Sequence, residues 1–202
     1  MDSISVSHPN IRKAISDGVL AIIFLLVTEA MLFAGLISAY IVNRAGAAAM
    51  WPPADQPRLP VEVTGFNTIV LISSAFVLYL FTRRVNRFYL SINFGGTKTT
   101  SLLLISILLG AAFLIIQGSE WAKMIGYGLT AHSSIYGAFF YTIIGIHGVH
   151  VLAGLSILLY LYFAVKNATS YQAAKNKIAA CTLYWYFVVA IWPILYRLVY
   201  FN

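Results

Sequence analysis

The sequence predicts an all-α integral membrane protein, a bundle of five transmembrane helices. Of the 202 residues, 60% are hydrophobic and only 9% are charged, whereas about 25% of the residues of a soluble domain are charged. Five apolar stretches approach the length of about 20 residues that crosses the hydrocarbon of a bilayer. The basic residues lie in short segments between those stretches. One water-soluble core cannot hold this many apolar side chains, so we expect residues 1–202 to form a single membrane domain.

The five predicted helices cover residues 18–42, 66–81, 101–117, 136–165 and 179–199. The second and third stretches are short for a span, so their ends are the least defined, and the fourth is long enough to tilt. The first stretch follows Arg12 and Lys13, as the core of a signal peptide would. It is too long for such a core and Glu29 interrupts it, so we expect a retained helix.

The Lys and Arg residues are distributed unevenly between the two sides of the predicted bundle. The N-terminal tail and the segments 82–100 and 166–178 lie on one side and hold nine of the 13 basic residues. The other side holds Arg44, Arg58, Lys123 and Arg197. Because cytoplasmic loops carry the excess of basic residues, we expect a cytoplasmic N-terminus and a C-terminus on the outer, periplasmic side. The net charge of +7 then reflects topology, not nucleic-acid binding.

The segment MWPPADQPRLPVEV, residues 50–63, holds four of the six prolines. Proline fixes φ and removes a backbone donor, so we expect this segment to form an extended, semi-rigid cap on the outer surface. The single cysteine, Cys181, excludes an intrachain disulfide, and we interpret it as a small buried hydrophobe.

Glu29 lies inside the first apolar run, where its carboxylate cannot be hydrated. An ionisable group at mid-membrane costs roughly 2.5–3.5 kcal/mol on insertion scales and marks a functional site by default. His147 and His150 of GIHGVHV are three residues apart on the fourth predicted helix, so they share a face. Glu29 and His147 each lie about 16 Å from their helix ends. We therefore expect a hydrogen bond or ion pair between the first and fourth helices; the alternative is a protonated Glu29 with both histidines bonded to nearby carbonyl groups.

Glu120 and Trp121 follow the third predicted helix. We expect both near the outer membrane interface, where a tryptophan ring is favoured. Glu120 is either a solvated interfacial carboxylate or a buried structural group, and the sequence favours neither interpretation. His132, in an outer loop, and His8, in the tail, are both interpreted as solvated.

The sequence lacks the residues that redox or hydrolytic chemistry would need. One Cys and four His cannot build a dinuclear copper centre of the two-Cys type, and no set of histidines on facing helices is available for haems. Two histidines on one helix could bind a metal only with further ligands, which are not evident. No G-x-S-x-G or H-E-x-x-H motif is present. We expect no catalytic residue and no metal site in this chain.

Four motifs, taken in order, resemble a known family. TEAMLFAGL, QGSEW, GIHGVHV and LYWYFVVAIWPILY are similar to segments of subunit III of the haem–copper respiratory oxidases, the cytochrome c and quinol oxidases. The family patterns are (S/T)-E-x-M-x-F, Q-x-x-E-W, H-x-x-H-V and Y-W-H-F-V-D-x-x-W. Each motif alone is weakly specific, but four in order are specific. Family members have seven helices, or five in a shorter bacterial form, which this chain resembles.

The resemblance implies a non-redox subunit of a proton-pumping terminal oxidase in a bacterial inner membrane, with cytochrome c preferred to quinol as the electron donor. Such a subunit packs beside catalytic subunit I, in a complex with subunit II and in some cases a small subunit IV. It stabilises the catalytic subunit, supports proton uptake during aerobic electron transport and binds membrane phospholipid in a cleft. The haem and copper cofactors lie in the partner subunits.

Matched residue by residue, Glu29 is the family's intramembrane carboxylate, His147 and His150 are its paired histidines, and Glu120 with Trp121 is its E-W pair. Those five residues are the candidate site: an intramembrane polar group with a structural or lipid-binding role, and an interfacial pair.

The last helix departs from the family pattern. Where the family has His and Asp, this chain has Tyr186 and Val189. An accessory subunit of nitric oxide reductase, which resembles the same family, is therefore the nearest alternative. An independent proton-coupled transporter using Glu29 and the histidines is a second alternative, but the chain has no internal repeat of the kind such transporters usually contain.

Overall fold

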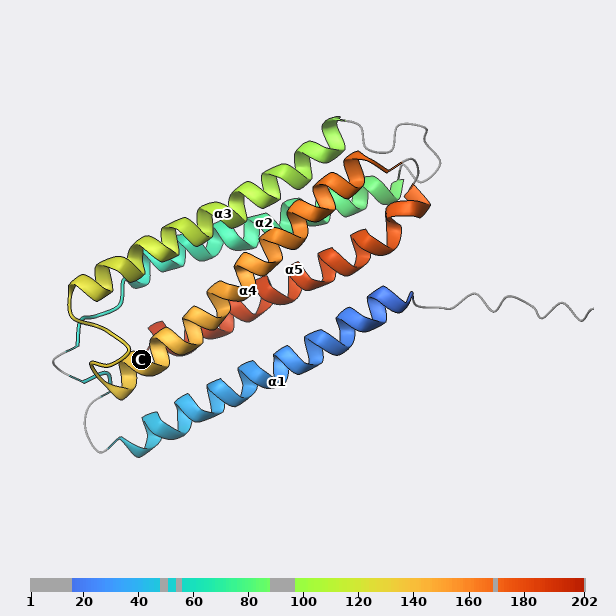
Figure 1. Cartoon of the computed structure of the whole chain (residues 1–202). Helices are drawn as coiled ribbons and strands as arrows, with labels where there is room; N and C mark the ends of the chain where they lie inside the picture. The colour runs from blue at the N-terminus through green and yellow to red at the C-terminus, as the bar shows by residue number, and fades with distance from the viewer. Residues whose placement is uncertain (1–15, 48–50, 54–55, 88–96, 169–170, 202) are drawn as a thin grey trace, which may run out of the picture.

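The computed structural model describes residues 16–47, 51–53, 56–87, 97–168 and 171–201. It contains α1 (Asp17–Gly46), α2 (Val61–Arg87), α3 (Thr97–Gly126), α4 (Ile135–Lys166) and α5 (Tyr171–Tyr200) (Figure 1). All five helices are long and apolar enough to cross a membrane, and the described residues include no strand. The predicted fold class is confirmed.

The five predicted apolar stretches all lie inside these helices, but the helices are longer than the stretches. They run for 27 to 32 residues, or about 40–48 Å at 1.5 Å per residue, which covers the hydrocarbon and much of both headgroup layers. The difference is largest for α2 and α3, whose ends are polar. Basic side chains such as Arg84, Arg87 and Lys123 occupy their last turns, where a cation complements the helix dipole.

Helices α2 to α5 form a four-helix group, and α1 lies along one side of it (Figure 1). Within the group, α2 packs on α3 and α5, and α4 packs on α3 and α5. Helix α1 contacts α4 and α5 but neither α2 nor α3. Apolar side chains occur all around this helix, and only 6% of its apolar 18-residue stretch is buried within the chain. Such a helix is stable in lipid, or against another subunit, and not in water.

The side chain of Trp185 fills the centre of the four-helix group. It belongs to α5 and is fully buried. A Cβ atom at Gly154 of α4 would lie 2.8 Å from Cε3 of the indole, and one at Gly110 of α3 would lie 2.7 Å from Cη2. The indole Nε1–H donates to Oγ of Ser74 on α2 at 3.2 Å, and the carbonyl of Ser74 accepts from Ser106 Oγ at 2.8 Å. One ring therefore joins all four helices, and it fits because two of its neighbours have no side chain.

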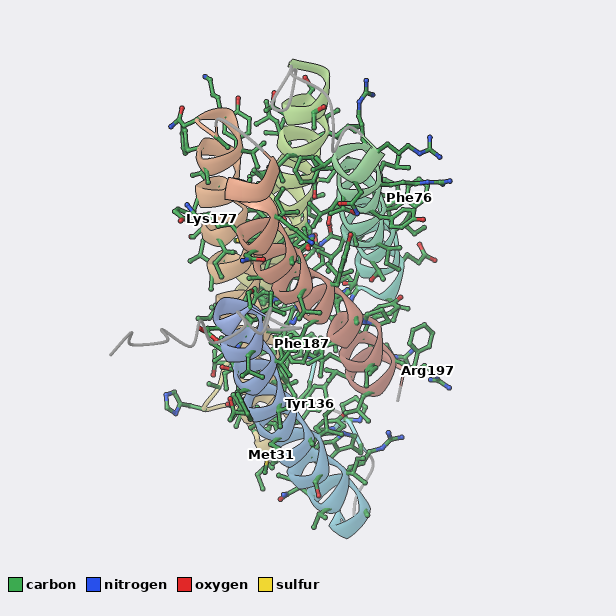
Figure 2. All side chains as sticks on the ribbon, turned by 90° about the vertical axis from the view of Figure 1, so that its right-hand side faces the viewer. Met31, Phe76, Tyr136, Lys177, Phe187 and Arg197 are labelled. Carbon is green, nitrogen blue, oxygen red and sulfur yellow. The ribbon has the colours of Figure 1, made fainter. Side chains whose placement is uncertain are left out.

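Helix α1 is attached to this group at a few points along its length. Phe33 and Tyr40 are its buried side chains. The Tyr40 hydroxyl accepts a hydrogen bond from Trp51 Nε1–H at 3.1 Å, and the Tyr40 ring packs edge-on against Phe139 of α4. On the opposite face, Met31 is 69% exposed and projects away from the bundle (Figure 2). Because so few side chains of α1 are buried, each contact carries a large share of its attachment.

Candidate intramembrane polar site

Glu29 of α1 and His150 of α4 form the polar contact between these two helices. The carboxylate oxygen Oε2 of Glu29 lies 2.8 Å from Nε2 of His150. Glu29 is the 13th of 30 residues of α1, and His150 is the 16th of 32 residues of α4. Both side chains therefore lie near the middle of their helices, at about the depth of the bilayer midplane. Their side chains are 22% and 13% exposed, so protein covers most of the pair and its remaining edge faces outward.

The hydrogen bonds of His150 fix how many protons the pair holds. Nδ1 of His150 lies 2.7 Å from the carbonyl oxygen of Ile146, and a carbonyl only accepts, so Nδ1 carries a proton. Nε2 and the Glu29 oxygen, 2.8 Å apart, must then share one further proton between them. The pair is either an imidazolium with a carboxylate or a neutral imidazole with a carboxylic acid. Both forms have zero net charge, so the pair avoids placing an uncompensated charge in the bilayer.

His147 lies one turn away from His150 but does not contact Glu29 through a hydrogen bond. Its side chain is buried, 1% exposed, and its ring stacks on Trp192 of α5 with 4.9 Å between centroids. Phe33 and Phe113 pack edge-on against the same ring. Neither ring nitrogen finds a hydrogen-bond partner among the described residues. The matching of depths indicated the correct pair of helices, but His150, not His147, is the partner of Glu29.

Glu120 and Trp121 lie inside α3, six and five residues before its end. The expectation that they follow the helix was wrong, because α3 continues past the apolar stretch into a polar end. Glu120 is 6% exposed, so the buried alternative holds, and its Oε1 lies 2.7 Å from Nζ of Lys123. Lys123 is exposed, and its ammonium group neutralises the buried carboxylate of Glu120. Trp121 packs its ring on Gly148 of α4, where a Cβ atom would lie 2.8 Å from Cη2.

The remaining residues singled out from the sequence lie apart from this pair. His132 is exposed in the turn between α3 and α4, and His8 lies outside the described residues. Tyr186 is half-buried against the core and Val189 is buried in it. Cys181 is buried as a free thiol. Within the described part of the chain, no three His, Cys, Asp or Glu side chains gather in a way that could hold a metal ion.

A buried polar network joining α2, α3 and α5 was not anticipated from the sequence. Asn67 Nδ2 donates to the carbonyl oxygen of Phe113 at 3.0 Å and to Gln117 Oε1 at 3.3 Å. Gln117 Nε2 in turn donates to the hydroxyl of Tyr200 at 3.0 Å. In the sequence, Asn67 and Gln117 stand out only as single amide side chains within or beside an apolar run. Such side chains hydrogen-bond across helices when lipid offers no alternative partner.

The geometry of the Glu29–His150 pair suits an interhelical attachment better than proton transfer. Among the described residues, neither side chain has a further side-chain partner to which a proton could pass. In the described part of the chain, His150 makes one further hydrogen bond, to the Ile146 carbonyl of its own helix, and its ring packs against Phe33 of α1. The pair can therefore hold one proton and fix α1 against α4, in a chain where α1 has few other contacts.

The sequence of the chain is similar to those of known proteins. A family model described as Cytochrome c oxidase subunit III matches residues 4–202. The chain belongs to the cytochrome c oxidase subunit III family. It is 31% identical over 194 residues to a cytochrome c oxidase subunit 3 from Synechocystis sp. (strain ATCC 27184 / PCC 6803 / Kazusa), covering 96% of this chain and 76% of the relative. It is also 33% identical over 174 residues to a probable cytochrome c oxidase subunit 3 from Mycobacterium leprae (strain TN), covering 86% of this chain and 82% of the relative.

A third relative, a cytochrome c oxidase subunit 3 from Thermostichus vulcanus, is 31% identical over 194 residues and is covered to 88%. The resemblance drawn from the four motifs is therefore confirmed. As a subunit III of a haem–copper oxidase, the chain is part of a multi-subunit complex. Its five apolar helices and bacterial relatives make it a multi-pass protein of the bacterial inner membrane.

Proposed function

We propose that this chain is the non-redox subunit III of a proton-pumping terminal oxidase that takes electrons from cytochrome c. In this proposal it packs beside catalytic subunit I, in a complex that also contains subunit II and in some cases a small subunit IV. It stabilises the catalytic subunit, supports its proton uptake and binds membrane phospholipid, and its N-terminus is cytoplasmic. The haem and copper lie in the partner subunits, so this chain itself holds no catalytic centre.

The observation that carries this proposal is the Glu29–His150 pair inside a chain of this family. Glu29 and His150 are the two side chains best placed for intramembrane chemistry, and their 2.8 Å contact attaches α1 to α4. The pair shares a proton and has zero net charge. A subunit whose ionisable groups hold its own helices together fits a supporting role better than a redox one. The relatives' name, cytochrome c oxidase subunit 3, favours cytochrome c over quinol as the donor.

The partners are tested by purification. The chain is tagged, extracted from its own membrane in mild detergent, and the intact complex is analysed by mass spectrometry together with its haem and copper content. The proposal predicts a multi-helix haem–copper subunit in equal amount. Recovery with a nitric oxide reductase subunit, or alone in active membranes, would contradict it.

The role of the pair is tested by Glu29→Ala, with Glu29→Gln as the matched control. Alanine leaves Nε2 of His150 without a partner, whereas the glutamine amide can still donate to it. We expect Glu29→Ala to shorten the catalytic lifetime of the oxidase while the haem spectra stay unchanged, and Glu29→Gln to retain most of that lifetime. A changed haem spectrum in Glu29→Ala would show that the residue acts on the redox centre itself.

A further inference from the structure

Two buried oxygen atoms of α2 have no hydrogen-bond partner among the described residues. They are Oδ1 of Asn67 and Oγ1 of Thr64, and both side chains are fully buried. The two residues are three positions apart, so they share a face of α2. A buried polar atom without a partner costs stability, and a bound water or ion is a common explanation for one. The two oxygens therefore indicate a site for a ligand.

The other half of the Asn67 side chain fixes its orientation. Its Nδ2 donates to the carbonyl oxygen of Phe113 at 3.0 Å and to Gln117 Oε1 at 3.3 Å. Neither of those oxygens can donate, so exchanging the amide nitrogen and oxygen of Asn67 would leave both contacts without a proton. Oδ1 of Asn67 is therefore an acceptor that needs a donor.

The hydroxyl of Tyr200 brings α5 to the same place. It accepts a hydrogen bond from Gln117 Nε2 at 3.0 Å, so its own proton remains to be donated. Its electrostatic partners also include Thr64, although Thr64 Oγ1 makes no hydrogen bond of acceptable geometry with any described residue. Polar groups that face one another beyond direct hydrogen-bond geometry are often bridged by water. Asn67, Thr64 and Tyr200 thus present one acceptor and two hydroxyls to a common ligand.

The charges around the site favour a neutral ligand. Glu62, two residues from Thr64, is exposed, and Glu120 is paired with Lys123. A buried cation would therefore lack a compensating carboxylate in the part of the chain that the structure describes. An anion would face Oδ1 of Asn67, which cannot donate to it. Water is neutral, it can donate two hydrogen bonds and accept two, and two to four polar partners are enough to hold it.

A pocket where α2 begins and α5 ends offers water a route to the site. Its volume is about 690 Å³, and its lining includes Trp51, Val61, Tyr136 and Tyr200. One water takes up about 30 Å³ in the liquid, so the pocket has room for several. Thr64 follows Val61 by three residues on α2, and Tyr200 belongs to both the pocket and the network. Water can therefore enter from this end of the bundle without crossing hydrocarbon.

We propose that one water molecule binds between α2 and α5, where it donates to Asn67 Oδ1 and to Thr64 Oγ1 and accepts from the Tyr200 hydroxyl. Through Gln117 this water joins the network that connects α2, α3 and α5. It is a structural ligand of the chain itself. The proposal goes beyond the role in the oxidase and does not rest on it.

The position of the water is tested by cryo-electron microscopy of the full chain, purified in mild detergent with the subunits that accompany it. We expect a density peak within about 2.5–3.0 Å of the oxygen atoms of Asn67, Thr64 and Tyr200. A map that shows ordered water at other buried sites but none at this one would overturn the proposal.

A stability measurement gives a second test, because a bound water and a site without one predict effects of opposite sign. Thr64→Val keeps the shape of the side chain and removes the hydroxyl. With water bound, the variant loses one hydrogen bond, and its unfolding equilibrium constant in detergent micelles should rise about fivefold. Without water, valine removes an unmet polar group. A Thr64→Val variant as stable as the wild type, or more stable, would therefore overturn the proposal.

The matched control is Thr182→Val. The Thr182 hydroxyl is also buried, but it donates to the carbonyl oxygen of Ile178 on its own helix at 2.7 Å. We expect Thr182→Val to change the unfolding equilibrium constant by less than about twofold, because that carbonyl keeps its backbone hydrogen bond. An equal loss in the two variants would also contradict the proposal, since the Thr64 hydroxyl would then contribute no more than one bonded within its own helix.

Discussion

The packing around Trp185 makes a quantitative prediction about two glycines of α4. Gly154→Ala places a Cβ atom 2.8 Å from Cε3 and 2.9 Å from Cζ3 of the indole, whereas carbon atoms are in favourable contact at about 3.5–4.0 Å. Gly145→Ala, nine residues earlier on the same helix, meets no atom within 4 Å. The first change should destabilise the fold and the second should not.

The size of the effect follows from how little Trp185 can move. Its other side lies against Gly110, where a Cβ atom would be 2.7 Å away, and its Nε1–H is held by Ser74. Overfilling a packed core costs about 1–3 kcal/mol. Replacing a helical glycine with alanine gains about 0.5–1 kcal/mol in either variant, so that gain cancels in the comparison. We expect Gly154→Ala to be about 1–3 kcal/mol less stable than Gly145→Ala.

The assay is equilibrium unfolding in mixed detergent micelles, followed by circular dichroism, on the wild type and the two variants. Gly154→Ala combined with Trp185→Phe should lose less stability than the two single changes add up to, because the smaller ring relieves the crowding. Equal unfolding free energies for Gly154→Ala and Gly145→Ala would refute the close packing of the indole described above.

Two further changes test the polar contacts between helices. Ser74→Ala removes the acceptor of the buried Trp185 N–H and should cost about 1–3 kcal/mol in the same unfolding assay; no loss of stability would show that the indole has another acceptor. Gln117→Leu removes the link between Asn67 and Tyr200. It should cost roughly 0.6–1.7 kcal/mol, which runs from the average to the largest value found for hydrogen bonds between membrane helices by double-mutant cycles. A leucine variant as stable as the wild type would show that the network is dispensable.

The five spans could be predicted from the sequence because hydrophobic length is a local property. The ends could not, since α3 continues from Gln117 to Gly126 through a segment that mixes polar and apolar residues. That segment is held by tertiary contacts such as Trp121 on Gly148. The burial of Glu120 depends on the same contacts.

The candidate site could be predicted only in part, for a geometric reason. Equal depth in the membrane identified α1 and α4 as the partners of one another. Which histidine faces Glu29 depends on the rotation of α4 about its axis, and residues three apart differ by about 60° around a helix. That rotation is set by packing, such as His147 on Trp192 and Phe33, which a single sequence does not reveal.

The amides of Asn67 and Gln117 were overlooked for a different reason. Each is a single polar residue in or beside an apolar run, and it shows no periodic pattern. Their partners lie 46 to 83 positions away in the sequence.

The central claim is that Glu29 and His150 share a proton and thereby hold α1 against the bundle. It is tested most directly by a double-mutant cycle of Glu29→Ala, His150→Ala and the double variant, with unfolding free energies measured in the same micelles. We predict a favourable coupling of about 0.6–1.7 kcal/mol between the two positions. A coupling of zero, with the effects of the two single variants simply adding, would contradict the claim.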